Sequence, residues 1–229
     1  MQHQPAATMP PRSIALRSPE GLAIAVTVLL AVTAVVYLFA VYTGFVLHGV
    51  TGDLVSHTRA DIRYADTLYS LSGAMQMMAL LATATVFIIW FHRVRGNAEV
   101  FTPEACTRGK GWTIGGWFVP IGNLWIPYQV AREIWTASAQ TAPDGSVRPF
   151  SRRPLTLWWG VWTSSLVIDR LGWAAHRNAE TTESLQRAYD ITILADVLGV
   201  AAALLAIGFV RRLTGMQRRK ATEGPYASS

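Results

Sequence analysis

Residues 21–47 read GLAIAVTVLLAVTAVVYLFAVYTGFVL, a run of 27 residues without a charged side chain. A helix that crosses the hydrocarbon core of a bilayer needs about 20 mostly apolar residues, so this run is long enough to span a membrane with some tilt. Its apolar residues are continuous rather than alternating, which favours a helix over a strand of a membrane barrel. The run exceeds the apolar region of a signal peptide, about 7–15 residues, so we expect it to remain as an anchor.

The rest of the chain has the composition of a membrane protein. Of its 229 residues, 51% are hydrophobic and only 15% are charged, whereas a soluble domain is about a quarter charged. Further apolar runs lie at about 68–92, 154–175 and 190–211. Because only helices and closed barrels satisfy the backbone in lipid, these runs predict an all-α integral membrane bundle of four transmembrane helices within residues 21–213. We expect residues 1–20 to form a disordered cytoplasmic arm, and residues 214–229 to form a cytoplasmic tail that is first basic and then polar.

The positive charges orient this bundle. With four crossings and a cytoplasmic N-terminus, fifteen of the 20 lysines and arginines lie inside, as the positive-inside rule requires. The sequence therefore predicts a multi-pass plasma-membrane protein with both termini in the cytoplasm. Anionic lipid accounts for the net charge of +6, so we expect no nucleic-acid partner. The residues predicted to contact lipid headgroups are Arg93, Arg95, Arg108, Lys110, Arg211 and Arg212.

Residues 111–138, GWTIGGWFVPIGNLWIPYQVAREIWTAS, are apolar but do not fit a fifth crossing. Such a crossing would place the basic tail outside, and Pro120 and Pro127 would each remove a helix hydrogen bond within lipid. We therefore predict one interfacial or re-entrant helical segment on the cytoplasmic side, with an amphipathic helix from Pro127 onward; whether it re-enters or lies flat stays open. Its characteristic residues are Trp112, Gly115, Gly116, Trp117, Pro120, Asn123, Trp125, Pro127 and Trp135.

Three stretches carry a resemblance to a known family: WFHRVRGNAEVF (90–101), the segment 111–138, and FVRRLTGMQ (209–217). Together they resemble the actinobacterial integral membrane proteins called domain of unknown function 4328, over most of residues 18–217. The resemblance implies a membrane protein with several helices. It implies no activity and no catalytic residues.

Asp196 is the one acid well inside a predicted span. An ionisable residue at that depth is costly and by default indicates function. Asp169 and Asp190 lie toward the same predicted external side, so the three acids form a candidate intramembrane polar site. Two interpretations stay open: a proton or cation site, or a buried polar contact between helices.

No motif in the chain predicts a catalytic site, a metal site or a cofactor. We therefore expect a non-enzymatic scaffold or partner-binding membrane subunit. One alternative is a small transporter or channel that uses Asp196, and a second is an intramembrane enzyme. The predicted partner is the lipid bilayer; a membrane or cytoplasmic protein partner and a homo-oligomer both stay open.

Overall fold

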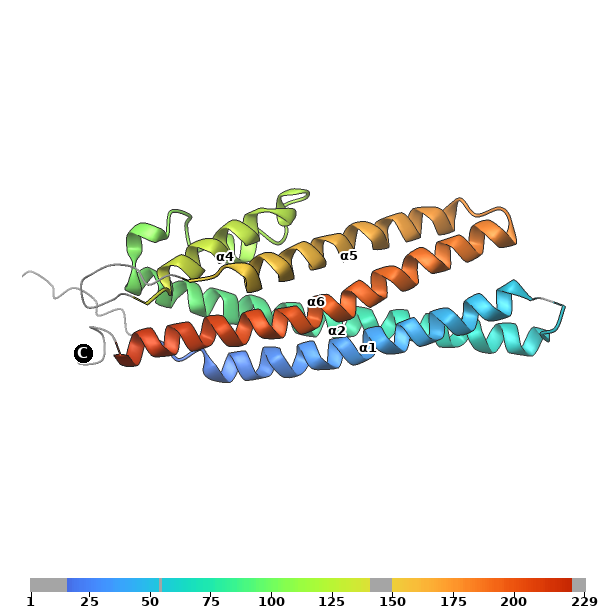
Figure 1. Cartoon of the computed structure of the whole chain (residues 1–229), viewed down its shortest axis with the longest axis horizontal. Helices are drawn as coiled ribbons and strands as arrows, with labels where there is room; N and C mark the ends of the chain where they lie inside the picture. Colours follow the sequence, from blue (N-terminus) through green and yellow to red (C-terminus); the bar gives the residue numbers. More distant parts are fainter. Residues whose placement is uncertain (1–15, 54, 141–149, 224–229) are drawn as a thin grey trace, which may run out of the picture.

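A computed structural model describes residues 16–53, 55–140 and 150–223, and every regular element within these ranges is a helix. Four long helices lie lengthwise beside one another (Figure 1): α1 (Glu20–Gly52), α2 (Arg59–Phe101), α5 (Arg153–Arg177) and α6 (Thr182–Glu223). The chain between α2 and α5 forms a 3-10 turn (Pro103–Ala105), the short helix α3 (Trp112–Gly115), a second 3-10 turn (Gly122–Leu124) and α4 (Ile126–Ala137). Residues 1–15 of the predicted arm and 224–229 of the predicted tail lie outside the described ranges.

Three of the described helices, α1, α2 and α6, are long and apolar enough to cross a membrane. Helix α5 does not meet that measure, so length and composition support three spans where the sequence predicts four. Its Asp169–Arg170 pair and its serine and threonine hydroxyls dilute the apolar content of a helix of 25 residues. Helix α6 also runs further than predicted, because it continues through residues 214–223 of the expected tail.

Local chemistry fixes where two of the long helices begin. Thr58 precedes α2, and its hydroxyl accepts a hydrogen bond from the Asp61 amide while the Asp61 carboxylate accepts one from the Thr58 amide. This capping box satisfies amides that otherwise have no partner in the first turn. Helix α5 begins with Pro154 in its first turn, where a missing amide hydrogen costs nothing.

The long helices pack in the order α5, α6, α1, α2. Helices α6 and α1 approach closely because Gly199 leaves room for the Tyr37 ring; a Cβ atom on Gly199 would lie 2.7–2.8 Å from three ring carbons. Between α1 and α2, the Thr43 hydroxyl donates to the Ser72 hydroxyl at 3.1 Å in the buried interface. Small residues and hydroxyl groups therefore hold these helices together, as is usual inside a bilayer.

Helices α2 and α5 stand at the two ends of this row and make few direct contacts, so a groove runs between them along α6. At the end of the bundle where α2 and α6 finish, the segment 112–137 fills the groove. Trp117 packs there on Phe87 of α2, at 5.7 Å between ring centroids, and on Trp162 of α5, also at 5.7 Å. At the opposite end no described part of the chain fills the groove.

Candidate functional site

The open half of the groove is a pocket of about 270 Å³ between α2, α5 and α6, which we call the vestibule. It extends from Tyr69 to Gln76 along α2, which at 1.5 Å per residue is about 10 Å of helix. Because the apolar run of α2 begins near Tyr69, the vestibule leads from the predicted membrane boundary into the predicted span. Its polar lining comes from Tyr69, Ser72, Gln76, Asp169, His176, Thr192 and Asp196.

Asp196 forms the inner wall of the vestibule and is only 7% exposed. Its Oδ1 accepts a hydrogen bond of 2.7 Å from the Gln76 side-chain amide across the groove. Its Oδ2 makes no hydrogen bond to any described residue, so it is available to a ligand or to water. Asp169 lines the same vestibule from α5, so the structure brings two of the three predicted acids together.

Asp190 does not belong to this site, which corrects the predicted group of three acids. Its Oδ1 lies 3.3 Å from Nε2 of His48, a contact between α6 and α1, and its side chain is 64% exposed. Asp190 is six residues before Asp196, and 3.6 residues per turn place those positions on different sides of α6. Conversely, sequence reasoning missed Gln76, although it is the one amide side chain in the apolar run 68–91.

Aromatic side chains fill the groove beyond the inner wall of the vestibule. The Trp158 ring of α5 lies 5.6 Å from Phe87 of α2 and stacks on Phe209 of α6 at 4.7 Å. Trp117 fills the remaining space and contacts both Trp159 and Trp162. In the described part of the chain, these rings fill the groove between the vestibule and the other end of the bundle.

The segment 111–138 enters the groove and turns back. Near its start, the Thr113 hydroxyl lies 2.8 Å from His92 Nδ1 on α2. At its far end, the Ala137 carbonyl accepts a hydrogen bond of 2.8 Å from the buried Lys220 ammonium of α6. Between these points Trp117 reaches Trp162 of α5, and α4 then runs back to the end of the bundle where α6 finishes. Among the predicted characteristic residues, Gly116, Pro127 and Trp135 are buried, Trp117 and Asn123 are half-buried, and Trp112, Gly115, Pro120 and Trp125 are exposed.

The turn of this segment is an exposed apolar tip. Phe118 is 72% and Ile121 is 71% exposed. Ile121 has a φ of 61°, and the Gly122 amide donates to the Pro120 carbonyl at 2.6 Å, which forms a γ-turn. A β-branched residue rarely adopts a positive φ, and such strain persists only where the surroundings enforce it. No sequence signal predicted this turn, because glycine or asparagine is the usual residue there.

A buried charge cluster ties α4 to α2. The side chain of Arg95 is fully buried, and its Nη1 donates to Glu133 Oε2 at 2.6 Å while its Nε donates to Glu99 at 3.2 Å. Arg108 Nη1 donates to Glu133 Oε1 at 2.7 Å. Burial raises the pKa of Glu133, but the hydrogen bonds from Arg95, Thr107 and Arg108 lower that pKa by more, so the net shift is downward.

This cluster corrects one predicted headgroup contact, because Arg95 has no exposed surface to offer a lipid. Arg108 is half-buried, and one of its guanidinium nitrogens already donates to Glu133. The remaining predicted contacts are accessible: Lys110, Arg211 and Arg212 are exposed, and Arg93 is half-buried. Sequence reasoning missed Glu133 as the partner of these arginines, since the pairs are 38 and 25 residues apart in the chain.

Comparison with known proteins gives a family but no relative of known activity. A family model described as "Domain of unknown function (DUF4328)" matches residues 54–215, from just before α2 to the last part of α6. No curated protein and no solved structure matches the chain.

Proposed function

The chain belongs to the DUF4328 family, a domain of unknown function, and from that premise we propose that it is a non-enzymatic membrane subunit that binds a partner in the vestibule. The single observation that carries the proposal is the vestibule itself: a pocket lined by Asp196 and Asp169, each within a predicted span. Ionisable groups at that depth are costly unless something pairs with them, and the second carboxylate oxygen of Asp196 makes no hydrogen bond to any described residue. Two acids favour a partner group that is positively charged or donates hydrogen bonds.

Photocrosslinking in native membranes tests this proposal. Gly73 lines the vestibule and has open space around it, so a benzoylphenylalanine there can reach an occupant. Leu80 on the same helix is exposed outside the vestibule and serves as the matched position. We expect a discrete crosslinked product from position 73 that is absent from position 80 and is lost on Asp196→Asn. The same products from both positions, or products unaffected by Asp196→Asn, would contradict the proposal.

We further propose that both termini lie in the cytoplasm. The start of α1 adjoins the end of α6, since the Glu20 carboxylate lies 3.7 Å from Arg218. Helix α2 finishes at that same end and α6 begins at the other, so α5 carries the chain along the bundle between them (Figure 1). On this proposal α5 traverses the membrane through its packing on α6, although its own composition is less apolar.

Cysteine labelling from either side of intact cells tests this topology. In a Cys106→Ser background, a single cysteine at the exposed position Ser151 marks the start of α5. A single cysteine at the exposed position Glu183, at the start of α6, marks the opposite end of the bundle. We expect an impermeant maleimide outside the cell to label position 183 and not position 151. Labelling of both positions from one side would contradict a traversing α5.

A transporter that uses Asp196 is the second candidate, and the observation that favours it is the Asp196 carboxylate oxygen that makes no hydrogen bond to the described residues. Transport would require Trp117 to move, because its ring closes the groove. Flux in proteoliposomes that disappears on Asp196→Asn would favour this candidate over a binding subunit. Flux that survives the substitution would remove Asp196 from any transport mechanism.

A further inference from the structure

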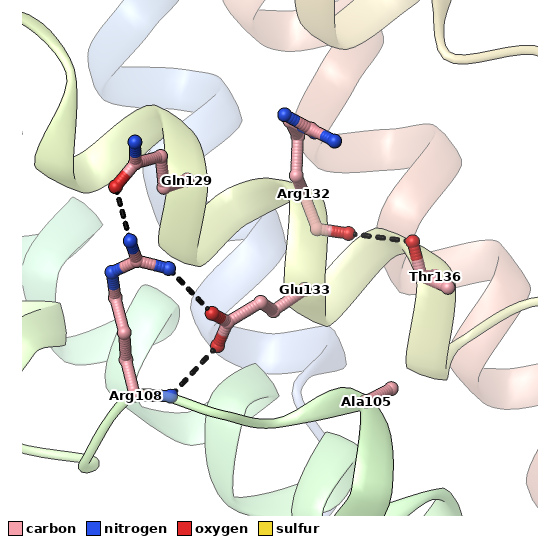
Figure 2. Close-up of a pocket in the computed structure, with 6 residues that line it drawn as sticks. All are labelled: Ala105, Arg108, Gln129, Arg132, Glu133 and Thr136. Atoms are coloured by element: carbon pink, nitrogen blue, oxygen red, sulfur yellow. Dashed lines mark hydrogen bonds and ion pairs between the residues drawn. The ribbon is translucent and has the colours of Figure 1, made fainter.

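A second pocket lies on the polar face of α4, at the opposite end of the bundle from the mouth of the vestibule. It measures about 300 Å³ and lies between α4 and the loop that follows α2 (Figure 2). Its wall holds Arg108 from the loop, and Gln129, Arg132, Glu133 and Thr136 from α4. We call it the α4 pocket.

The one carboxylate in the α4 pocket is already saturated. Glu133 Oε1 accepts from the Thr107 hydroxyl and from Arg108 Nη1, both at 2.7 Å. Its Oε2 accepts from Arg95 at 2.6 Å and from the Arg108 amide at 3.3 Å. Four donors therefore occupy the acid, which leaves it little capacity to attract a further cation.

The groups that stay unsatisfied in the α4 pocket are donors. Arg108 donates to a side-chain atom of Gln129; because a guanidinium only donates, that atom is the amide oxygen, and the Gln129 NH₂ group points away from Arg108 (Figure 2). Arg132 is exposed, and its guanidinium makes no hydrogen bond to any described residue. Thr136, one turn further on, already accepts from Arg152 at 3.2 Å, which brings another positive charge to the rim.

We propose that the α4 pocket binds the phosphate group of an anionic phospholipid, held by Arg132, the Gln129 amide and the outer edge of Arg108. Guanidinium groups suit phosphate oxygens because they present paired donors in a plane. A lipid is favoured over a soluble phosphate because Trp125, one turn before Gln129, is 49% exposed and leads into the apolar tip at Phe118 and Ile121. The inference rests on the membrane placement of the bundle, but it does not depend on the vestibule.

The test measures phosphatidylglycerol binding to the full-length purified protein in detergent, by native mass spectrometry and by titration. Arg132→Gln removes one charge without breaking a side-chain hydrogen bond or ion pair to any described residue, and Arg219→Gln, on an exposed arginine of α6, removes the same charge elsewhere. Gln129→Glu keeps an acceptor for Arg108 but places a second carboxylate in the pocket. We expect binding to weaken about tenfold for Arg132→Gln, as for the loss of one charge-assisted hydrogen bond. Gln129→Glu should weaken it at least as much, and Arg219→Gln should leave it unchanged.

Several outcomes would overturn the inference. Equal losses for Arg132→Gln and Arg219→Gln would indicate attraction to general positive charge rather than a pocket. Equal binding of phosphatidylcholine would show that the pocket does not select an anionic headgroup. Displacement of the lipid by an equal concentration of inorganic phosphate would identify a soluble anion as the ligand. Asp196→Asn should not alter lipid binding, so failure of the vestibule proposal and failure of this one are separate results.

Discussion

Replacing Glu133 with glutamine removes the charge that neutralises a fully buried arginine. The Arg95 guanidinium would keep Glu99, which is 3.2 Å away but 35% exposed, and would lose the negative charge of its closer partner, Glu133 at 2.6 Å. Removing one partner of a buried ion pair costs about 3–5 kcal/mol. Because Glu99 remains and the Arg108 contact is partly exposed, we expect the free energy of unfolding to fall by about 3 kcal/mol.

The assay is denaturant unfolding in detergent micelles, followed by tryptophan fluorescence, with Glu99→Gln as the matched variant. Glu99 is the more exposed partner of the same arginine, so we expect its loss to cost only about 0.5 kcal/mol. A Glu133→Gln effect no larger than that of Glu99→Gln would refute the view that Glu133 is the main counter-charge of Arg95.

The lowered pKa of Glu133 also predicts that the stability lost in Glu133→Gln depends on pH. The folded-state pKa of Glu133 is lowered, so its stabilisation is present above the pKa of an unfolded glutamate and is lost as the pH falls through the folded-state pKa. The stability advantage of the wild-type chain over Glu133→Gln should therefore shrink on acidification. An advantage that stays constant down to acid pH would contradict the assigned ionisation of Glu133.

Three further substitutions test the packing, each by its effect on the free energy of unfolding. Gly199→Ala should lower the free energy of unfolding by about 1–3 kcal/mol, because the new methyl group meets the Tyr37 ring. Gly208→Ala on the same helix has open space and should be neutral or stabilising. Equal effects of the two substitutions would contradict the close approach of α1 and α6. Ile121→Gly should raise the free energy of unfolding by about 1 kcal/mol by relieving the positive φ, and a loss of stability would show that the turn is not strained. Lys220→Met should lower the free energy of unfolding by about 2 kcal/mol, since the ammonium donates to the Ala137 and Ala139 carbonyls. Arg219→Met should have little effect, and equal effects would contradict the view that Lys220 holds the end of α4 to α6.

The candidate site was predictable only in part, and Asp196 shows the reason. An acid inside an apolar run is visible in the sequence, because its cost in lipid depends on local composition. Its partner Gln76 lies 120 residues away, on a helix that reaches it only after the bundle has formed. Asp190 appeared equivalent to Asp169 by position along the chain, yet the rotation of α6 turns it toward His48 and away from the vestibule.

By itself, the sequence determined that the chain is helical, that it holds helices apolar enough to cross a membrane, and that residues 111–138 do not form an ordinary span, because apolar length and proline placement act locally. Only the tertiary structure decided that Arg95 is buried against Glu133, that Trp117 closes one end of the groove, and that the opposite end stays open around Asp196. These features depend on which faces of distant helices meet. That outcome is set by small residues such as Gly199 and by charge pairs between segments far apart in the chain, and neither is encoded in the hydropathy of any one segment.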